Sequence, residues 1–337
     1  MCTTVLFGVS NMPPCKSPLW WSFQVDRNHL EDSPMKATRL QAYGGPDQFK
    51  VEDVAEPVPG AGQVLVKVAA TGLNPFEISL RKGYMAAKIP LKLPATLGID
   101  VAGTVAALGS DVTNLKVGDR VTGMLKVNGA GSNAGFTVAA ADGLALIPEN
   151  VDFAAAATLP VAGQTGWQAV SNSLQPKKGD RVLVTGALGT VGRTVVFALT
   201  QLGAIPVAGV RAGREGEARK LGLEPMVIGG PAPAAKFDGA VDTVGGEVAA
   251  SLLSLVKDGG KVATIAGLPE NHPKDGAVKA VSVFGKNNVA DLSTLLAAVG
   301  RGDLVLPIAR RIPLSNIAEG HRLYEAGSVG GKIVFTA

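Results

Sequence analysis

A short glycine-rich stretch is the part of this sequence whose residue types and spacing most clearly indicate chemistry. It runs Gly186-Ala-Leu-Gly189-Thr-Val-Gly192, between a strand-like apolar segment, 181–185, and a segment of helical periodicity, 190–202. The second glycine lets the backbone approach a pyrophosphate, and the third lets the helix pack closely on the strand. The first N–H groups of the helix then point at the phosphates. The stretch predicts a dinucleotide site; the alternative is a tight strand-to-helix turn without a ligand.

Two arginines follow the next predicted strand, 205–210. The sequence there reads Arg211-Ala-Gly-Arg214, and the first acidic residue is Glu215. A site for NAD would place a carboxylate about 20 residues beyond the glycines, to bind the ribose 2′-hydroxyl. Arginine is suited instead to a phosphate. The pattern favours NADP over NAD, against the alternative that both side chains are merely solvated at a helix start.

Cysteine and histidine usage argues against a metal site. Both thiols, Cys2 and Cys15, lie in the first 34 residues, and the histidines are His29, His272 and His321. No cysteine-ligated zinc and no disulfide framework can form beyond that segment, and no ligand-like spacing occurs. We predict no metal. The lack of disulfides favours a cytoplasmic location.

The rest of the chain must position these groups, and it divides into two kinds of pattern. Short, closely spaced strands over 35–155 predict a partly open β-barrel. Over 156–298, strands alternate with helices, which predicts an α/β fold with a doubly wound parallel sheet of the Rossmann type. The segment 299–337 is expected to return to the first domain.

The first segment and the overall charge exclude several classes of protein. Residues 1–34 are proline-rich and aperiodic, which favours a disordered tail or a mis-assigned start over a transit peptide. The formal net charge is +4, without a basic run, so no nucleic-acid partner is expected. No apolar stretch reaches about 20 residues, so no membrane partner is expected either.

An ordered set of motifs extends the interpretation to nearly the whole chain. From 35 to 337 the sequence resembles the medium-chain dehydrogenase/reductase superfamily, in its zinc-independent quinone-oxidoreductase-like branch. The motifs are Gly72-Leu-Asn74-Pro75-Phe-Glu77, Leu80-Arg-Lys-Gly83-Tyr84, Leu97-Gly98-Ile-Asp100-Val-Ala-Gly103, Val117-Gly-Asp-Arg-Val121, Leu159-Pro-Val-Ala-Gly-Gln-Thr165, the glycine turn and Gly331-Lys332-Ile333-Val334. The family's zinc enzymes have Cys, His and Glu ligands where this chain has Asn74 and Asp100.

The resemblance implies a GroES-like substrate domain, a homodimer and a set of NADPH-binding residues. The pyrophosphate would be held by the glycine turn, and the 2′-phosphate by the two arginines. Thr165 would lie near the nicotinamide, and later loops would line the same site. The implied cofactor residues are Thr165, Gly186, Leu188, Gly189, Thr190, Val191, Arg211, Arg214, Gly267, Leu268 and Phe284.

On the substrate side, the resemblance points to Asn74 and Tyr84. Asn74 would donate to a carbonyl oxygen, and Tyr84 would donate a proton or stack on a flat acceptor. The alternatives are a simple turn before proline for Asn74 and a place on the pocket rim for Tyr84. The implied activity is hydride transfer from NADPH to a quinone or an α,β-unsaturated carbonyl. An enoyl reductase of a biosynthetic pathway and a non-catalytic NADPH-binding redox sensor remain as alternatives.

Overall fold

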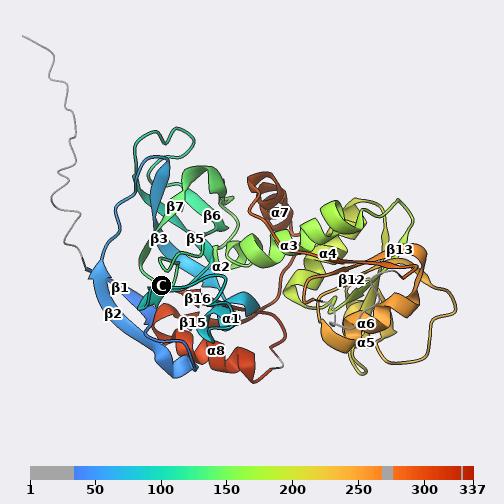
Figure 1. Ribbon diagram of the computed structural model, residues 1–337. Coiled ribbons are helices and arrows are strands. Elements are labelled where there is room, and N and C mark those ends of the chain that lie inside the picture. Colours follow the sequence, from blue (N-terminus) through green and yellow to red (C-terminus); the bar gives the residue numbers. More distant parts are fainter. Residues whose placement is uncertain (1–33, 268–275, 328) are drawn as a thin grey trace, which may run out of the picture.

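Two large sheets of different kind dominate the computed structural model, which describes residues 34–267, 276–327 and 329–337. A parallel sheet lies at one end of the molecule and antiparallel strands lie at the other, with helices α3 (Gln164–Gln168) and α4 (Thr190–Gln201) between them (Figure 1). The predicted Leu268 and most of the predicted extension fall outside the described residues.

The parallel sheet has the strand order β11-β10-β9-β12-β13-β14, in which the order reverses beside β9. This confirms the predicted doubly wound sheet. Its strands are β9 (Arg181–Thr185), β10 (Ile205–Val210), β11 (Glu224–Val227), β12 (Phe237–Asp242), β13 (Val256–Thr264) and β14 (Lys279–Ser282). The helices along this part are α4, α5 (Glu215–Lys220) and α6 (Gly246–Leu255).

The alternation of side chains along β9 explains why helices cover both faces of this sheet. Val182 and Val184 are buried in one core cluster, together with residues of α4. Leu183 points the other way, into a second cluster with Leu252 of α6. Successive residues of a strand face opposite sides, so a strand that is apolar throughout needs cover on both. No helix forms between β11 and β12, where the two prolines Pro231 and Pro233 lie.

The antiparallel part contains a seven-stranded open path, β15-β16-β3-β5-β6-β8 with β7 attached to β3, and the three-stranded sheet β2-β1-β4. Among the described residues this path does not close into a barrel, which agrees with the predicted partly open one. The strands are β1 (Pro34–Leu40), β2 (Phe49–Ala55), β3 (Gln63–Gly72), β4 (Ala95–Thr96), β5 (Asp100–Leu108), β6 (Arg120–Met124), β7 (Phe136–Ala140), β8 (Leu144–Leu146), β15 (Ile308–Pro313) and β16 (Lys332–Thr336).

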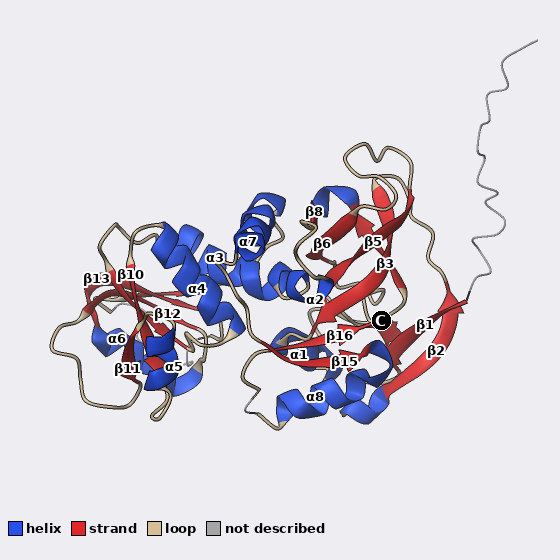
Figure 2. Ribbon diagram, turned by 180° about the vertical axis from the view of Figure 1, so that it is seen from behind, coloured by secondary structure: helices blue, strands red, loops and turns tan. Residues whose placement is uncertain are grey.

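The last strand pairs antiparallel with β3, so the end of the chain lies among the first strands. Helices α1 (Pro75–Arg81) and α8 (Ile317–Glu325) lie beside this junction (Figure 2). The pairing agrees with the expected return of 299–337, while the domain boundaries at 34/35, 155/156 and 298/299 stay predictions.

The junction between the two parts is a helical segment to which sequence periodicity assigns no element. It comprises α2 (Phe153–Ala156), η4 (Leu159–Gly163), α3 and η5 (Ala169–Leu174), and it packs against α7 (Val289–Arg301). One core cluster joins Ala102 of β5, Leu159, Phe197 of α4 and Leu295 of α7. A segment buried on nearly all sides lacks the amphipathic period by which a surface helix is recognised.

Candidate active site

The glycine turn has the geometry that its sequence predicts. Gly186 follows β9 with φ +65°, a conformation that side chains disfavour. A Cβ on Gly192 would lie 2.1 Å from the carbonyl oxygen of Gly186, so only glycine fits there. Gly189 caps α4 without any side-chain hydrogen bond. The first N–H groups of the helix therefore keep no side-chain cap, which suits a phosphate ligand.

Gly189 is the least crowded of the three glycines of the turn. A Cβ added to it would meet only the Gly186 carbonyl oxygen, at 3.3 Å, within 4 Å. On the inner side, α3 approaches α4 so closely that a Cβ on Gly166 would lie 2.7 Å from the Val191 carbonyl oxygen. The turn therefore packs against α3 on its inner side, and its backbone is least crowded at Gly189, where a pyrophosphate would approach.

A buried aspartate that the sequence analysis missed shapes the same turn. Asp242, at the end of β12, is fully buried and accepts hydrogen bonds from the hydroxyls of Thr185 (2.7 Å) and Thr264 (2.8 Å). It also accepts the N–H of Gly245 at 3.0 Å. The carboxyl ends of β9, β12 and β13 are thereby tied together beneath Gly186. An aspartate directly after the apolar run Gly239-Ala-Val241 was the signal available in the sequence.

The two predicted arginines differ in their surroundings. Arg211 is exposed and forms no side-chain hydrogen bond or ion pair with any described residue. Arg214 makes a bidentate contact with Glu217 of α5, with Nε–Oε1 at 2.7 Å and Nη2–Oε2 at 2.6 Å. The charge of Arg193, on α4, also acts on Glu217. The sequence analysis missed Arg193, because the tertiary fold alone brings α4 beside α5.

Thr165 comes together with the connection that follows β14. A Cβ on Gly285 would lie 2.2 Å from the Thr165 hydroxyl, so this crossing requires glycine. The neighbouring Phe284 is 82% exposed, and Gly267, with φ +89°, has nothing within 4 Å of its Cβ position. The structure therefore brings Thr165 against Gly285, the residue that directly follows the exposed Phe284.

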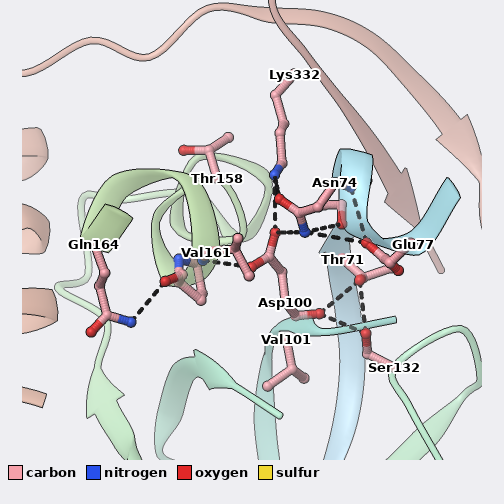
Figure 3. Close-up of polar contacts among 12 residues, drawn as sticks. Thr71, Asn74, Glu77, Asp100, Val101, Ser132, Thr158, Val161, Gln164 and Lys332 are labelled. Atoms are coloured by element: carbon pink, nitrogen blue, oxygen red, sulfur yellow. Dashed lines mark hydrogen bonds and ion pairs between the residues drawn. The ribbon is translucent and has the colours of Figure 1, made fainter. Parts of the chain in front are cut away.

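On the other side of the junction, a buried polar cluster joins Asn74, Glu77, Asp100 and Lys332 (Figure 3). All four are at most 5% exposed. The amide nitrogen of Asn74 donates to Asp100 Oδ2 at 3.0 Å and to Glu77 Oε2 at 3.2 Å, and its oxygen accepts from Lys332 Nζ. Lys332 also forms an ion pair with Asp100, with Nζ–Oδ2 at 3.1 Å. We call these four residues the buried cluster.

Asp100 links the buried cluster to the helical junction. Its Oδ1 accepts the N–H of Val161 at 2.8 Å, within η4, four residues before Thr165. Its own carbonyl oxygen accepts the hydroxyls of Thr71 and Ser132, both at 2.6 Å. A single carboxylate thus joins β5 to the segment that carries Thr165.

Glu77 has an unusual proton affinity. Burial and the charge of Asp100 together raise its pKa to about 7, although the backbone hydrogen bond from Asn74 and the charge of Lys332 act to lower it. At neutral pH the carboxyl group is therefore divided between its protonated and ionised forms. Protonation of Glu77 removes a second carboxylate charge from beside the ion pair of Lys332 and Asp100.

The two predicted substrate residues lie at opposite ends of α1. Asn74 precedes the helix and is 1% exposed, whereas Tyr84 follows it and is 74% exposed. The Asn74 amide already bonds to Glu77, Asp100 and Lys332, so contact with a substrate would require one of these bonds to break. The Tyr84 hydroxyl is accessible. Both substrate roles stay predictions.

The far end of α1 is fastened by Arg81, which is fully buried. It donates to His321 Nδ1 at 3.2 Å, pairs with Glu325 at 2.7 Å and bonds the Gly44 carbonyl oxygen. Burial and the charge of Arg81 together lower the pKa of His321 to about 3, although the charge of Glu325 acts to raise it. His321 is therefore neutral at physiological pH and serves as a packed acceptor.

The described residues contain neither a metal-binding cluster nor a membrane-spanning helix. Across 34–267, 276–327 and 329–337, no three His, Cys, Asp or Glu side chains gather in a way that could hold a metal ion. In the same ranges, every helix is too short or too polar to cross a bilayer.

Comparison with known proteins places these features in a family. Residues 60–149 match the alcohol dehydrogenase GroES-like domain, and residues 226–335 match the zinc-binding dehydrogenase domain. A quinone oxidoreductase of Mus musculus is 30% identical over 329 residues, which span 89% of this chain and 97% of the relative.

This chain belongs to the medium-chain dehydrogenase/reductase superfamily. Within that superfamily, it belongs to the quinone-oxidoreductase-like branch.

Two further relatives support this assignment. A 2-methylene-furan-3-one reductase of Solanum lycopersicum is 35% identical over 250 residues, covering 70% of this chain and 63% of that protein. The solved quinone oxidoreductase of Coxiella burnetii superposes with a TM-score of 0.82 at 29% identity, covering 90% of this chain and all of that one. This medium-chain dehydrogenase/reductase is therefore an oxidoreductase of a family that uses nicotinamide cofactors, and its uncapped glycine turn fits the diphosphate of such a cofactor.

Proposed function

We propose that this enzyme is an NADPH-dependent reductase that transfers a hydride to a quinone or an α,β-unsaturated carbonyl compound without a zinc ion. The observation that carries the proposal is the open glycine cradle at Gly189, with arginine and no acid at the end of the adjacent strand β10. The name of the tomato relative supports an enone acceptor, and those of the other two relatives support a quinone.

The cofactor would be held by groups that the structure leaves accessible. Backbone N–H groups of Thr190 and Val191 would bind the diphosphate, and Arg211 would bind the ribose phosphate by charge-assisted hydrogen bonds. The chemistry that NADPH supplies when bound is the delivery of a hydride. Thr165 and Phe284 would border the nicotinamide end and exclude water from it.

The residues of this chain would orient the acceptor and complete its protonation. Reduction of a quinone by a hydride also needs a proton on oxygen, and the exposed hydroxyl of Tyr84 can pass one from solvent. In this proposal the buried cluster acts through position, because Asp100 holds the Val161 turn and so the segment of Thr165.

The buried cluster does not suit a zinc ion. The ammonium group of Lys332 lies 3.1 Å from Asp100, where it already neutralises the carboxylate that a cation would need. Zinc in proteins is bound by thiolate, imidazole and carboxylate groups. The cluster offers an amide, a partly protonated carboxyl and a carboxylate paired with an ammonium. Metal analysis of the purified protein should therefore find less than stoichiometric zinc.

Coenzyme oxidation by the purified chain, followed with a panel of quinones and enones, tests the activity. We expect oxidation of NADPH, at lower coenzyme concentration than NADH, with at least one acceptor. Binding of NADPH without turnover on any acceptor would refute the enzyme and favour a redox sensor. Turnover restricted to enoyl thioesters would favour an enoyl reductase instead.

The arginine after β10 provides the matching test of cofactor choice. The variant Arg211→Ala should weaken NADPH binding by about tenfold or more, because a charge-assisted bond to the phosphate is lost, and leave NADH within about twofold. Equal losses for both coenzymes would refute the phosphate role. The homodimer and cytoplasmic location also stay predictions; light scattering of the purified chain tests the first.

A further inference from the structure

A group of charged side chains lies where α4 and α5 meet, and it includes Arg214, the second arginine expected at the ribose phosphate. Arg193 belongs to the first turns of α4, and Arg214 and Glu217 belong to the start of α5. The parallel strands β9 and β10 are neighbours, so the helices that follow them start side by side. These are the strand ends at which a dinucleotide's adenosine ribose binds in doubly wound sheets.

Arg193 is the first unexplained member of this group. Its Nε is buried and has no hydrogen-bond partner among the described residues, although the side chain as a whole is partly exposed. Leaving a buried donor unsatisfied costs free energy. A guanidinium that carries such a donor at the edge of a ligand site is suited to an anion that arrives with the ligand.

Glu217 is the second member of this charged group whose contacts need an explanation. Its side chain is exposed, and its pKa is nevertheless lowered. The main cause is the hydrogen bond from Arg214, and the charges of Arg214, Lys220 and Arg193 add to it. Its bidentate contact occupies the Nε and Nη2 of Arg214, which are the groups that a phosphate would use. An ion pair this exposed contributes little to stability, so it can be exchanged at low cost.

We propose that Arg193 is a third guanidinium of the ribose-phosphate site, beside Arg211 and Arg214, and that Glu217 competes with that phosphate for Arg214. Glu217 would then set how strongly the enzyme prefers the phosphorylated coenzyme. This inference rests on the proposed NADPH dependence and adds to it two specificity-determining residues, one attractive and one repulsive. Discrimination between ligands commonly uses both kinds of element.

Removal of Glu217 should strengthen the site. The variant Glu217→Gln keeps the shape of the side chain and removes the competing charge. We expect it to bind adenosine 2′,5′-bisphosphate and NADPH about three- to tenfold more tightly, with NADH and AMP unchanged within about twofold. In an Arg214→Ala background the gain should shrink, because the guanidinium set free is no longer present.

Removal of Arg193 should act in the opposite direction. The variant Arg193→Ala should weaken adenosine 2′,5′-bisphosphate by about fivefold or more and leave AMP within about twofold, and Arg193→Lys should restore part of the loss. Arg219→Ala is the matched control. It removes an exposed arginine from the last turn of α5, and it should change neither affinity.

Isothermal titration of the full-length chain with these adenosine phosphates measures all the affinities without turnover, and thermal melting of each ligand-free variant shows that it is folded. Equal effects of Arg193→Ala on both probes, or no gain from Glu217→Gln, would overturn this inference and leave the NADPH proposal intact if Arg211→Ala still discriminates. A wild-type chain that binds adenosine 2′,5′-bisphosphate no better than AMP would overturn the NADPH proposal itself.

Discussion

The buried cluster around Asp100 and the arginine group around Glu217 both place acids beside bases, yet their surroundings are opposite. In the first, every member is at most 5% exposed and bonds to another member. In the second, the Arg214 and Glu217 side chains are 40% and 53% exposed, and the charges of Arg214, Lys220 and Arg193 all act on one glutamate. Charges that satisfy one another in a dry interior cannot be exchanged, whereas unbalanced charges in water are ready for a ligand.

This difference separates two kinds of contribution to function. The buried cluster joins segments as distant in sequence as Asn74 and Lys332, and it holds the junction through Val161. The arginine group, with its exposed ion pair, contributes little to the fold, and in our proposal it determines which anion binds. Mutations should accordingly change stability in the first region and coenzyme preference in the second.

The largest expected effect is that of Asp100→Ala. It leaves the ammonium of Lys332 buried without its carboxylate, which costs about 3–5 kcal/mol of unfolding free energy. Urea unfolding monitored by tryptophan fluorescence measures this. The control is Asp53→Ala, which breaks an exposed pair with Lys36 and should cost less than about 1 kcal/mol. Similar losses in the two variants would show that burial does not distinguish these pairs.

The next effect is a pH dependence from Glu77. Its pKa is about 7 in the folded chain and near 4.5 in the unfolded one, so between these values the folded state binds more protons. Stability therefore falls as the pH rises from about 4.5 to about 7, by about 3 kcal/mol for this group.

The variant Glu77→Gln removes this titration. Relative to wild type, its unfolding free energy should rise progressively between pH 5 and pH 8. The exposed Glu149→Gln should show no such trend. A constant difference between Glu77→Gln and wild type across this range would mean that Glu77 is already ionised at pH 5.

The effect of ionic strength on coenzyme binding and on stability should also differ between the two regions, and it should be smaller than the two effects above. Raising ionic strength from about 0.05 to 0.5 M should reduce the preference for NADPH over NADH severalfold, because the arginine group is exposed to screening. The stability loss of Asp100→Ala should change little over the same range. Coenzyme titrations and urea unfolding at each salt concentration test the contrast, which a salt-independent preference would contradict.

The smallest effect is expected from Arg214→Ala on the fold. Loss of its exposed pair with Glu217 should change the unfolding free energy by less than about 0.5 kcal/mol. Thermal melting without coenzyme measures this. A loss of unfolding free energy as large as that of Asp100→Ala would show that Arg214 stabilises the fold, and it would contradict the distinction between the two regions.

Local features of this protein could be predicted from sequence. The bounds of β9 and β10 agree with the predicted strands, and α4 ends one residue before its predicted end. The turn between β9 and α4 requires glycine at position 192, because its backbone packs against Gly186, six residues away. Such features depend on neighbouring residues alone, so periodicity and glycine spacing contain the information.

Other features depended on chain segments that meet only after folding. Lys332 donates a hydrogen bond to Asn74, which lies 258 positions away in the sequence. The charge of Arg193 acts on Glu217, which belongs to a separate helix. The predicted contact of Asn74 with a carbonyl oxygen remains a prediction, because its amide is committed to partners that the motif did not reveal.

The sequence by itself determined the alternation of strands and helices, the glycine turn and the choice of arginine after β10, because each is written in residues close along the chain. The tertiary structure decided which charges are buried and which remain in water. That outcome depends on how the two sheets and the helical junction exclude solvent, and on which side chains from distant segments are left to pair.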